Sequence, residues 1–221
     1  MTKWPTTLSR FSSTIARTQL EEYCDMITKE ELLQLVSASN NYEDCLKIVR
    51  KYIIHGTPYV FQGREEEFYE FRECIANKYQ INFHEVLILG SAKLGYSYHK
   101  DSIFSAESDI DVALVNERLF EDFIESICTY QYAKGKALFT TNQDEEKQYF
   151  RFLKYLVRGW MRPDLLPKRV QVKTIRKEWF DFFKSISYGN SSVGDYIVTG
   201  GVFKNYHFLE KYYVESLLKL K

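Results

Sequence analysis

The stretch that decides the fold is "LILGSAKLGYSYHKDSIFSAESDIDVALV", residues 87–115. It contains two short apolar runs. The first ends abruptly at Gly90-Ser91, and the second, from Ile110 to Val115, is preceded and interrupted by acidic residues. Short apolar runs bounded by turn residues are typical of buried strands. We therefore expect two neighbouring strands, with a Gly-Ser turn at the end of one and aspartates at the start of the other.

Patterns with helical spacing lie on both sides of these runs. Thr28 is followed three residues later by Glu31, a capping box that predicts the start of a helix. Further along, "RVQVKTI" alternates like a strand, and "GDYIVTGGVF" also predicts a strand or a hairpin arm. Helices are expected over these ranges: 28–38, 41–56, 64–79, 116–135, 145–160, 177–186 and 206–220.

These elements predict an α/β (α+β) fold with a small mixed β-sheet core that helices flank. We expect residues 1–82 to form a helical N-terminal region packed on this core, and residues 83–221 to form the main domain. The segment before residue 83 has little linker character, so one continuous domain is the alternative.

Composition favours a packed globular chain. The chain has 221 residues, of which 45% are hydrophobic, so a sizeable core is expected. Lys plus Arg equals Asp plus Glu, 30 each, which argues against a protein that binds nucleic acid through its overall charge. A local basic patch stays open, and its candidates are the C-terminal lysines and the cluster of Lys168, Arg169, Lys173, Arg176 and Lys177.

The cysteines and the hydropathy pattern bear on the compartment. Cys24, Cys45, Cys74 and Cys128 form no CxxC pair, so reduced thiols are expected rather than a zinc site or disulfides. No apolar run approaches the roughly 18 residues that a membrane span needs. The sequence therefore predicts a soluble, cytoplasmic protein without a membrane partner.

The two aspartates point to a bound cation. Side chains alternate between the two faces of a strand, so Asp109 and Asp111 project from the same face. Two neighbouring carboxylates repel each other, by about 1 kcal/mol at 4 Å in water and by more near a protein interior. Mg²⁺ relieves such repulsion, and it commonly binds one or two carboxylates plus substrate phosphates. Asp109 and Asp111 are therefore the candidate metal ligands and catalytic residues.

The Gly-Ser turn supplies a candidate phosphate site. Gly90 has no side chain, so a phosphate can come close to its backbone, and Ser91 offers a hydroxyl and a backbone N–H. Next to a carboxylate pair, such a turn predicts a metal–nucleotide site, where catalysis consists mainly of positioning and charge neutralisation. Lys93 is a further candidate for phosphate contact, with an ordinary solvated lysine as the alternative.

These residues together resemble the nucleotidyltransferase superfamily that includes DNA polymerase β, and in particular its short bacterial members. In that family a strand ends in Gly-Ser, a helical turn follows, and the next strand begins with Asp-x-Asp. The resemblance covers residues 85–116. It implies that Gly90 and Ser91 hold the triphosphate and that Asp109 and Asp111 hold the metal. Ser108 occupies the polar position often found before the pair.

The resemblance also implies an activity. Mg²⁺ or Mn²⁺ would be the cofactor, and an NTP, with ATP expected, would donate its nucleoside monophosphate to a hydroxyl acceptor. That acceptor would lie on RNA, protein or a small molecule, and the setting would be a toxin–antitoxin pair or phage defence, with a protein partner.

The sequence departs from the family pattern in two respects. Seventeen residues separate Ser91 from Asp109, which is longer than in compact members and predicts an extended loop beside the site. The family also carries a third carboxylate on a later strand. The expected strand, "RVQVKTI", has Gln171 and Lys173 but no acid, while Asp164 is near in sequence.

Several aromatic residues and one histidine have two interpretations each. Tyr96 and Tyr98 are candidates for base stacking, with ordinary half-buried packing as the alternative. His99 is a candidate substrate contact or a plain surface-loop histidine. The aromatic residues expected in the core are Trp160, Trp179, Phe180 and Phe183.

Three hypotheses of function follow. The first is a metal-dependent nucleotidyltransferase. The second is a catalytically inactive protein of the same fold that binds nucleotide or a protein partner as a regulator. The third is a structural subunit, similar to an antitoxin, with a vestigial site. The missing third carboxylate distinguishes the first hypothesis from the others.

Overall fold

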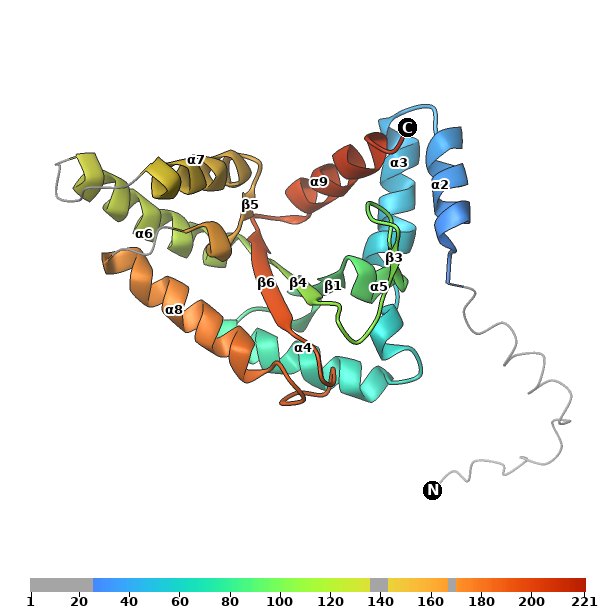
Figure 1. Ribbon diagram of the computed structural model, residues 1–221, viewed down its shortest axis with the longest axis horizontal. Coiled ribbons are helices and arrows are strands. Elements are labelled where there is room, and N and C mark those ends of the chain that lie inside the picture. Colours follow the sequence, from blue (N-terminus) through green and yellow to red (C-terminus); the bar gives the residue numbers. More distant parts are fainter. Residues whose placement is uncertain (1–25, 136–142, 167–169) are drawn as a thin grey trace, which may run out of the picture.

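A four-stranded mixed sheet forms the centre of the structure, a computed structural model that describes residues 26–135, 143–166 and 170–221 (Figure 1). Its strand order is β1-β4-β6-β5. The strands are β1 (Val86–Leu89), β4 (Ile110–Val115), β6 (Val198–Phe203) and β5 (Trp160–Met161). β4 pairs antiparallel with β1 and parallel with β6, and β5 pairs antiparallel with β6. The fold is therefore of the predicted α+β class.

Helices make up most of the remaining described chain. The α-helices are α2 (Lys29–Ala38), α3 (Tyr42–Ile48), α4 (Glu65–Tyr79), α5 (Ser91–Leu94), α6 (Glu117–Gly135), α7 (Gln143–Val157), α8 (Val170–Ser185) and α9 (Tyr206–Leu218). A π-helix, η1 (Val49–Ile54), continues α3, and three short 3₁₀ helices are η2 (Tyr59–Phe61), η3 (Phe83–Glu85) and η4 (Pro163–Leu165). Across the described ranges, none of these helices combines the length and apolarity of a membrane span.

The central strand β4 is apolar because both of its faces are covered. Ile110, Val112 and Leu114 lie in one hydrophobic cluster, and Ala113 and Val115 lie in another. This explains the nearly continuous apolar run in the sequence, as expected for a strand buried on two sides. Asp111 takes the one position of the run that opens to solvent.

The two clusters give the molecule its layers (Figure 1). On one face, α4, α6 and α8 cover the sheet through Phe71, Ile75, Phe120, Phe123, Trp179 and Phe183. On the other face, α2, η1 and α9 contribute Leu32, Val49, Leu209 and Val214. The second cluster joins helices before residue 82 to strands and a helix after it. The division of the chain at that residue stays a prediction.

Helices from the two ends of the described chain lie side by side (Figure 1). Arg50 of η1 forms an ion pair with Glu210 of α9 at 2.6 Å, and the Lys221 Nζ donates to the Ser39 carbonyl at 2.6 Å. The predicted capping box at Thr28 is confirmed, since Thr28 N donates to Glu31 Oε2 at 2.8 Å and Glu31 N donates to the Thr28 hydroxyl at 3.2 Å.

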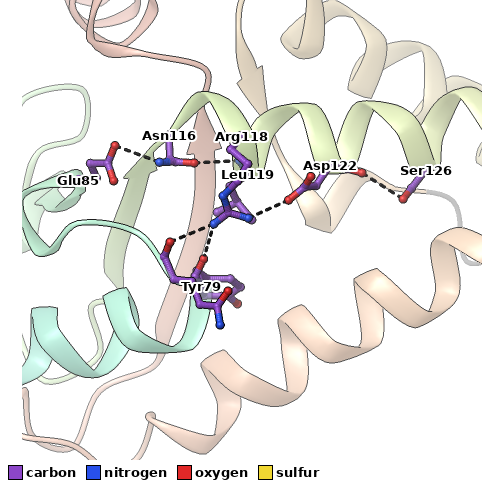
Figure 2. Close-up of polar contacts among 8 residues, drawn as sticks. Tyr79, Glu85, Asn116, Arg118, Leu119, Asp122 and Ser126 are labelled. Atoms are coloured by element: carbon purple, nitrogen blue, oxygen red, sulfur yellow. Dashed lines mark hydrogen bonds and ion pairs between the residues drawn. The ribbon is translucent and has the colours of Figure 1, made fainter.

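A polar network fixes the connection between α4, β4 and α6 (Figure 2). Asn116 accepts from Leu119 N at 2.9 Å, which caps α6, and donates to Glu85 at 3.0 Å. Arg118 donates to the carbonyl of Tyr79 at 2.8 Å, where α4 ends. These bonds satisfy helix-terminal groups that would otherwise lack partners, and they hold β4 in register beneath its helices.

The structure corrects the prediction for "RVQVKTI". Residues 170–175 form the first turns of α8 rather than a strand. Alternation over so few residues also fits a helix, and the apolar spacing Ile175–Trp179–Phe183 shows that the helical period continues. The strand next to β4 is β6, which "GDYIVTGGVF" predicts correctly.

Three short strands were not predicted. β5 has two residues, and the predicted extended loop contains a two-stranded sheet of β2 (Tyr96–Ser97) and β3 (Ser102–Ile103). Strands this short show no periodicity in sequence. Of the cysteines, Cys45 is buried and Cys74 and Cys128 are exposed, all as free thiols, while Cys24 lies outside the described residues.

Candidate functional site

The Gly-Ser turn and the aspartates meet at one end of the sheet. In the antiparallel pairing of β1 with β4, Leu89 lies opposite Asp111, so Gly90 comes next to that carboxylate. A Cβ atom on Gly90 would lie 2.8 Å from Asp111 Oδ2, and the Gly90 φ is +65°. Both the space and the backbone conformation therefore require glycine here.

The acid pair lies at the start of β4 in a pocket of about 850 Å³. Gly90, Ser91, Asp109 and Asp111 all line it, and so does Ser108. Ser108 accepts from Ser105 N at 3.0 Å, which shapes the turn before the pair. The strand neighbours that the sequence suggested thus bring the two motifs together.

The environment of Asp111 disfavours the charged form of its carboxyl group. The surrounding protein raises its pKa by desolvation, against a lowering by the Thr199 hydrogen bond, and the nearby Asp109 carboxylate raises the pKa further. Arg162 and Lys100 lower it by attraction. The side chain is still exposed within the pocket. A cation at this position would offset both the desolvation of the Asp111 carboxylate and its repulsion by Asp109.

The position opposite Asp111 on the next strand is a threonine. β6 pairs with β4 so that Thr199 faces Asp111, and the Thr199 hydroxyl donates to Asp111 Oδ1 at 3.2 Å. Asp164 also lines the pocket, but Arg162 holds it through bonds of 3.1 and 2.7 Å. Within the described residues, no group of three or more His, Cys, Asp or Glu side chains is placed to hold a metal ion.

The donors present still fit Mg²⁺ or Mn²⁺. Asp109 and Asp111 offer hard carboxylate oxygens, and the Ser91 and Thr199 hydroxyls stand in the same pocket. Mg²⁺ is often held by one or two carboxylates and completes its shell with water and substrate phosphates. The raised pKa of Asp111 has the physical cause that a bound cation would remove.

Lys93 and Tyr96 do not join this site. Lys93 is buried, and its Nζ donates to the carbonyls of His55 and Gly56 at 2.5 and 2.7 Å. Tyr96 donates through its hydroxyl to the Thr28 carbonyl at 3.2 Å. Both side chains fasten the helical N-terminal region to the core and are absent from the pocket lining.

Tyr98 and His99 form a wall of the pocket together with α9. His99 Nε2 lies 2.6 Å from Ser216 Oγ, and the Tyr98 hydroxyl lies 3.5 Å from the same atom. Burial lowers the pKa of His99, and the charge of Lys219 lowers it further, so the imidazole is neutral near pH 7. These residues give the pocket an uncharged polar wall.

Arg162, Lys100 and Thr199 belong to the site but were not predicted. Thr199 lies in a strand that was predicted, and only the pairing of that strand with β4 reveals its role. Arg162 and Lys100 act on Asp111 through charge across the pocket. Gln171 and Lys173, considered for the third position, begin α8, and their side chains lie outside the described residues.

No protein-family model, curated protein or solved structure matches this chain. The resemblance to nucleotidyltransferases therefore remains a prediction from the residues themselves.

Proposed function

We propose that the chain is a metal-dependent nucleotidyltransferase that transfers a nucleoside monophosphate from an NTP, with ATP expected, to a hydroxyl acceptor. One observation carries this proposal. Gly90, which follows β1, lies so close to the Asp111 carboxylate near the start of β4 that a Cβ on the glycine would be 2.8 Å from Asp111 Oδ2. A phosphate-accepting backbone next to an acid pair is what nucleotide–metal chemistry needs.

Each residue has a distinct role in this proposal. Gly90 and Ser91 would seat the outer phosphates, because the glycine leaves the backbone accessible and the serine adds a hydroxyl. Asp109 and Asp111 would hold Mg²⁺ or Mn²⁺. When bound, the metal neutralises the negative charge of the triphosphate. Thr199 would orient the Asp111 carboxylate through its hydrogen bond.

The reaction is a substitution at the α-phosphorus. The acceptor oxygen forms a bond to that phosphorus as the bond to the bridging oxygen breaks and pyrophosphate leaves. The proton of the hydroxyl passes to water. Attacking and leaving oxygens lie roughly in line in such transfers, so acceptor and pyrophosphate lie on opposite sides of the α-phosphorus.

The test is transfer from labelled NTPs to candidate RNA, protein and small-molecule acceptors in the presence of Mg²⁺. We expect Asp109→Ala and Asp111→Ala each to lower transfer by about a hundred-fold or more, since each removes a group that stabilises developing charge. Asp144→Ala is the matched control, because that aspartate is exposed on α7 and lies outside the pocket. Absence of transfer, or transfer that both pocket variants retain, would sink the proposal.

Thr199 favours a second candidate function, nucleotide binding without turnover. A hydroxyl faces Asp111 where the family resemblance leads one to expect an acid. A protein of this kind would act as a sensor or regulator. Calorimetry would then show Mg²⁺-dependent ATP binding that Asp111→Ala abolishes, while no pyrophosphate forms. Measurable pyrophosphate release would reject this candidate and favour the first.

A further inference from the structure

Tyr188 has an unusual backbone conformation at the mouth of the pocket. Among the described residues other than glycine, only Gln80 and Tyr188 have a positive φ, and Tyr188 has a φ of 57°. Gln80 simply ends α4, whereas a bulky aromatic side chain is a true outlier in this region. Tyr188 is 58% exposed and lines the pocket. Strain of this kind concentrates at functional sites.

The helix that leads to Tyr188 presents a row of side chains in which an aromatic ring lies between two cations, and we name this row the α8 stripe. It consists of Arg176, Phe180 and Lys184, which are four residues apart and so share one face of the helix. The Arg176 guanidinium lies 4.6 Å from the centre of the Phe180 ring. Phe180 was expected in the core, but it is 37% exposed.

The neighbouring face of α8 explains why the C-terminal part of this stripe, Phe180 and Lys184, is presented toward the pocket. Trp179 and Phe183 are buried against β6, where Trp179 Nε1 donates to the Gly200 carbonyl at 3.3 Å. Phe180 and Lys184 are adjacent to these anchors in sequence and line the pocket. Cations and an aromatic ring therefore lead along the helix toward Tyr188.

The stripe lies on the acceptor side of the site. The strand order places β4, with the acid pair, between β1 and β6. Gly90 and Ser91 follow β1, whereas Ile197, which lines the pocket beside Tyr188, precedes β6, and its carbonyl accepts from Ile110 N at 2.8 Å. Leaving and attacking groups must lie on opposite sides of the transferred phosphorus. With phosphates at Gly90-Ser91, the acceptor comes from the β6 side.

We propose that the α8 stripe and Tyr188 bind the single-stranded end of a nucleic acid and lead its terminal hydroxyl into the Asp109–Asp111 pocket. The transfer step rests on the proposed function, but the binding does not. Aromatic rings accept bases of any sequence by stacking, and spaced cations track the phosphates between them. Of the basic candidates that the sequence suggested, Lys168, Arg169 and the Lys173 side chain lie outside the described residues. Among the described basic side chains of α8, Lys177 forms an ion pair with Asp181, and Arg176 and Lys184 are the cations we assign to the nucleic-acid backbone.

Equilibrium binding tests this proposal without any need for catalysis. The full chain is titrated into a fluorescently labelled ten-nucleotide single-stranded RNA, and anisotropy is followed at several salt concentrations. We expect weak binding whose log K falls with log salt at a slope of about −1.4, since each phosphate contact to a single strand contributes about −0.7. Lys184→Ala should reduce this slope to about −0.7, whereas the exposed Lys47→Ala should leave it unchanged.

The aromatic residues provide the second measurement. We expect Tyr188→Ala and Phe180→Ala each to weaken binding by about five-fold to a hundred-fold, the range for loss of one stacked base. Tyr188→Phe keeps the ring and should bind like the original chain. Tyr188→Asn tolerates the left-handed conformation, so its loss of binding would not come from misfolding. Tyr132→Ala, an exposed tyrosine of α6 outside the pocket lining, is the matched control.

The outcomes separate this inference from the proposed function. Binding that depends on Tyr188 and survives in Asp109→Ala supports the inference even where no transfer occurs. An RNA that does not bind at low salt, or binds equally well to the Tyr188 and Phe180 variants, overturns it. If a protein acceptor is modified in a Tyr188-dependent way and the RNA does not compete, the surface binds protein, and the nucleic-acid proposal is wrong.

Discussion

Gly90 shows how one residue without a side chain defines the candidate site. Its φ of +65° is costly for other residues, and an added Cβ would meet Asp111 Oδ2 at 2.8 Å. The two effects differ in kind. The first is intrinsic to the backbone, whose φ of 65° and ψ of −146° lie in a region that residues other than glycine rarely adopt, and it costs about 1–3 kcal/mol. The second displaces the carboxylate on which metal binding depends.

Gly90→Ala should therefore lower stability by more than the backbone strain alone and should also weaken Mg²⁺-ATP binding. The matched control is Gly63→Ala, because Gly63 has a similar φ of +68° but no atom within 4 Å of its Cβ position. Urea denaturation measures the loss for both variants, expected at about 1–2 kcal/mol for Gly63→Ala. Calorimetry should show weakened nucleotide binding for Gly90→Ala alone. Equal binding by both variants would show that the approach to Asp111 has no function.

Lys93 and Thr199 mark the limit of what single residues reveal in sequence. Lys93 follows the Gly-Ser turn closely enough to suggest a phosphate contact, but its Nζ reaches back to two carbonyls at the end of η1. Thr199 carries no sequence signal of its own and becomes part of the site only through its pairing with Asp111. Local spacing predicts which residues are near in the chain, whereas side-chain direction and strand register depend on distant partners.

At the scale of elements, the packing of α8 on β6 determines the open side of the pocket. A Cβ on Gly200 would lie 2.2 Å from the Phe183 ring, so this strand must have glycine for the helix to come so close. The anchoring of α8 here is what turns Phe180 and Lys184 toward the pocket. Because Gly200 has no side chain, α8 packs closely on β6, and this packing sets the position of the proposed acceptor surface.

Gly200→Ala should push α8 away from the sheet and destabilise the fold by about 1–3 kcal/mol, the usual cost of overpacking. Phe183→Leu makes room at the same contact and should cost about 1 kcal/mol by itself. Because both changes act at one contact, the double variant should be more stable than the sum of the two losses predicts. Urea denaturation of the four proteins completes the cycle, and strictly additive losses would show that the contact does not limit the packing.

The elements that sequence predicted correctly are the ones with long or strongly apolar patterns. β1 is a continuous apolar run, β4 is apolar apart from Asp111, β6 has apolar residues on both sides of Thr-Gly-Gly, and α2 begins with its capping box. The error at the start of α8 arose because alternation within the seven residues of "RVQVKTI" is compatible with either structure. β5 was missed because two residues pair only through their neighbour β6.

At the scale of the whole molecule, two apolar clusters hold the sheet while its open end gathers charge. The fold class followed from the order of elements, and the acid pair and Gly-Ser turn followed from a motif within 30 residues of sequence. The other walls come from α8, α9 and the residues before β6, about 70 to 125 residues away in sequence. Sequence patterns could not bring these walls together, because tertiary packing alone decides which segments meet.

The free energy of unfolding of the whole chain should depend on pH, because Asp111 is less favourably charged in this pocket than in the unfolded chain. Its folded-state pKa is raised above the ordinary 3.8 by desolvation, against the Thr199 hydrogen bond, and by Asp109. In the pH window between these two values the folded state holds a proton that the unfolded state releases, so stability falls as pH rises. Above the folded-state pKa the full cost is present. Asp111→Asn removes the charge, so it should be more stable than the original chain at pH 7 and no more stable below about pH 3.8.

Mg²⁺ supplies the converse test of the same carboxylate. If the site binds Mg²⁺ with a Kd of about 1 mM, 10 mM Mg²⁺ should stabilise the original chain by about 1.4 kcal/mol. That gain corresponds to a rise in melting temperature of roughly 3–6 °C for a chain of this size. Asp111→Asn should gain much less, because a neutral amide is a weaker ligand, and Asp144→Asn should gain as much as the original chain. Equal gains in all three proteins would show that Mg²⁺ binds elsewhere. If Asp111→Asn is instead less stable than the original chain at pH 7 without Mg²⁺, the Asp111 carboxylate stabilises the fold and is not a cation ligand that destabilises it.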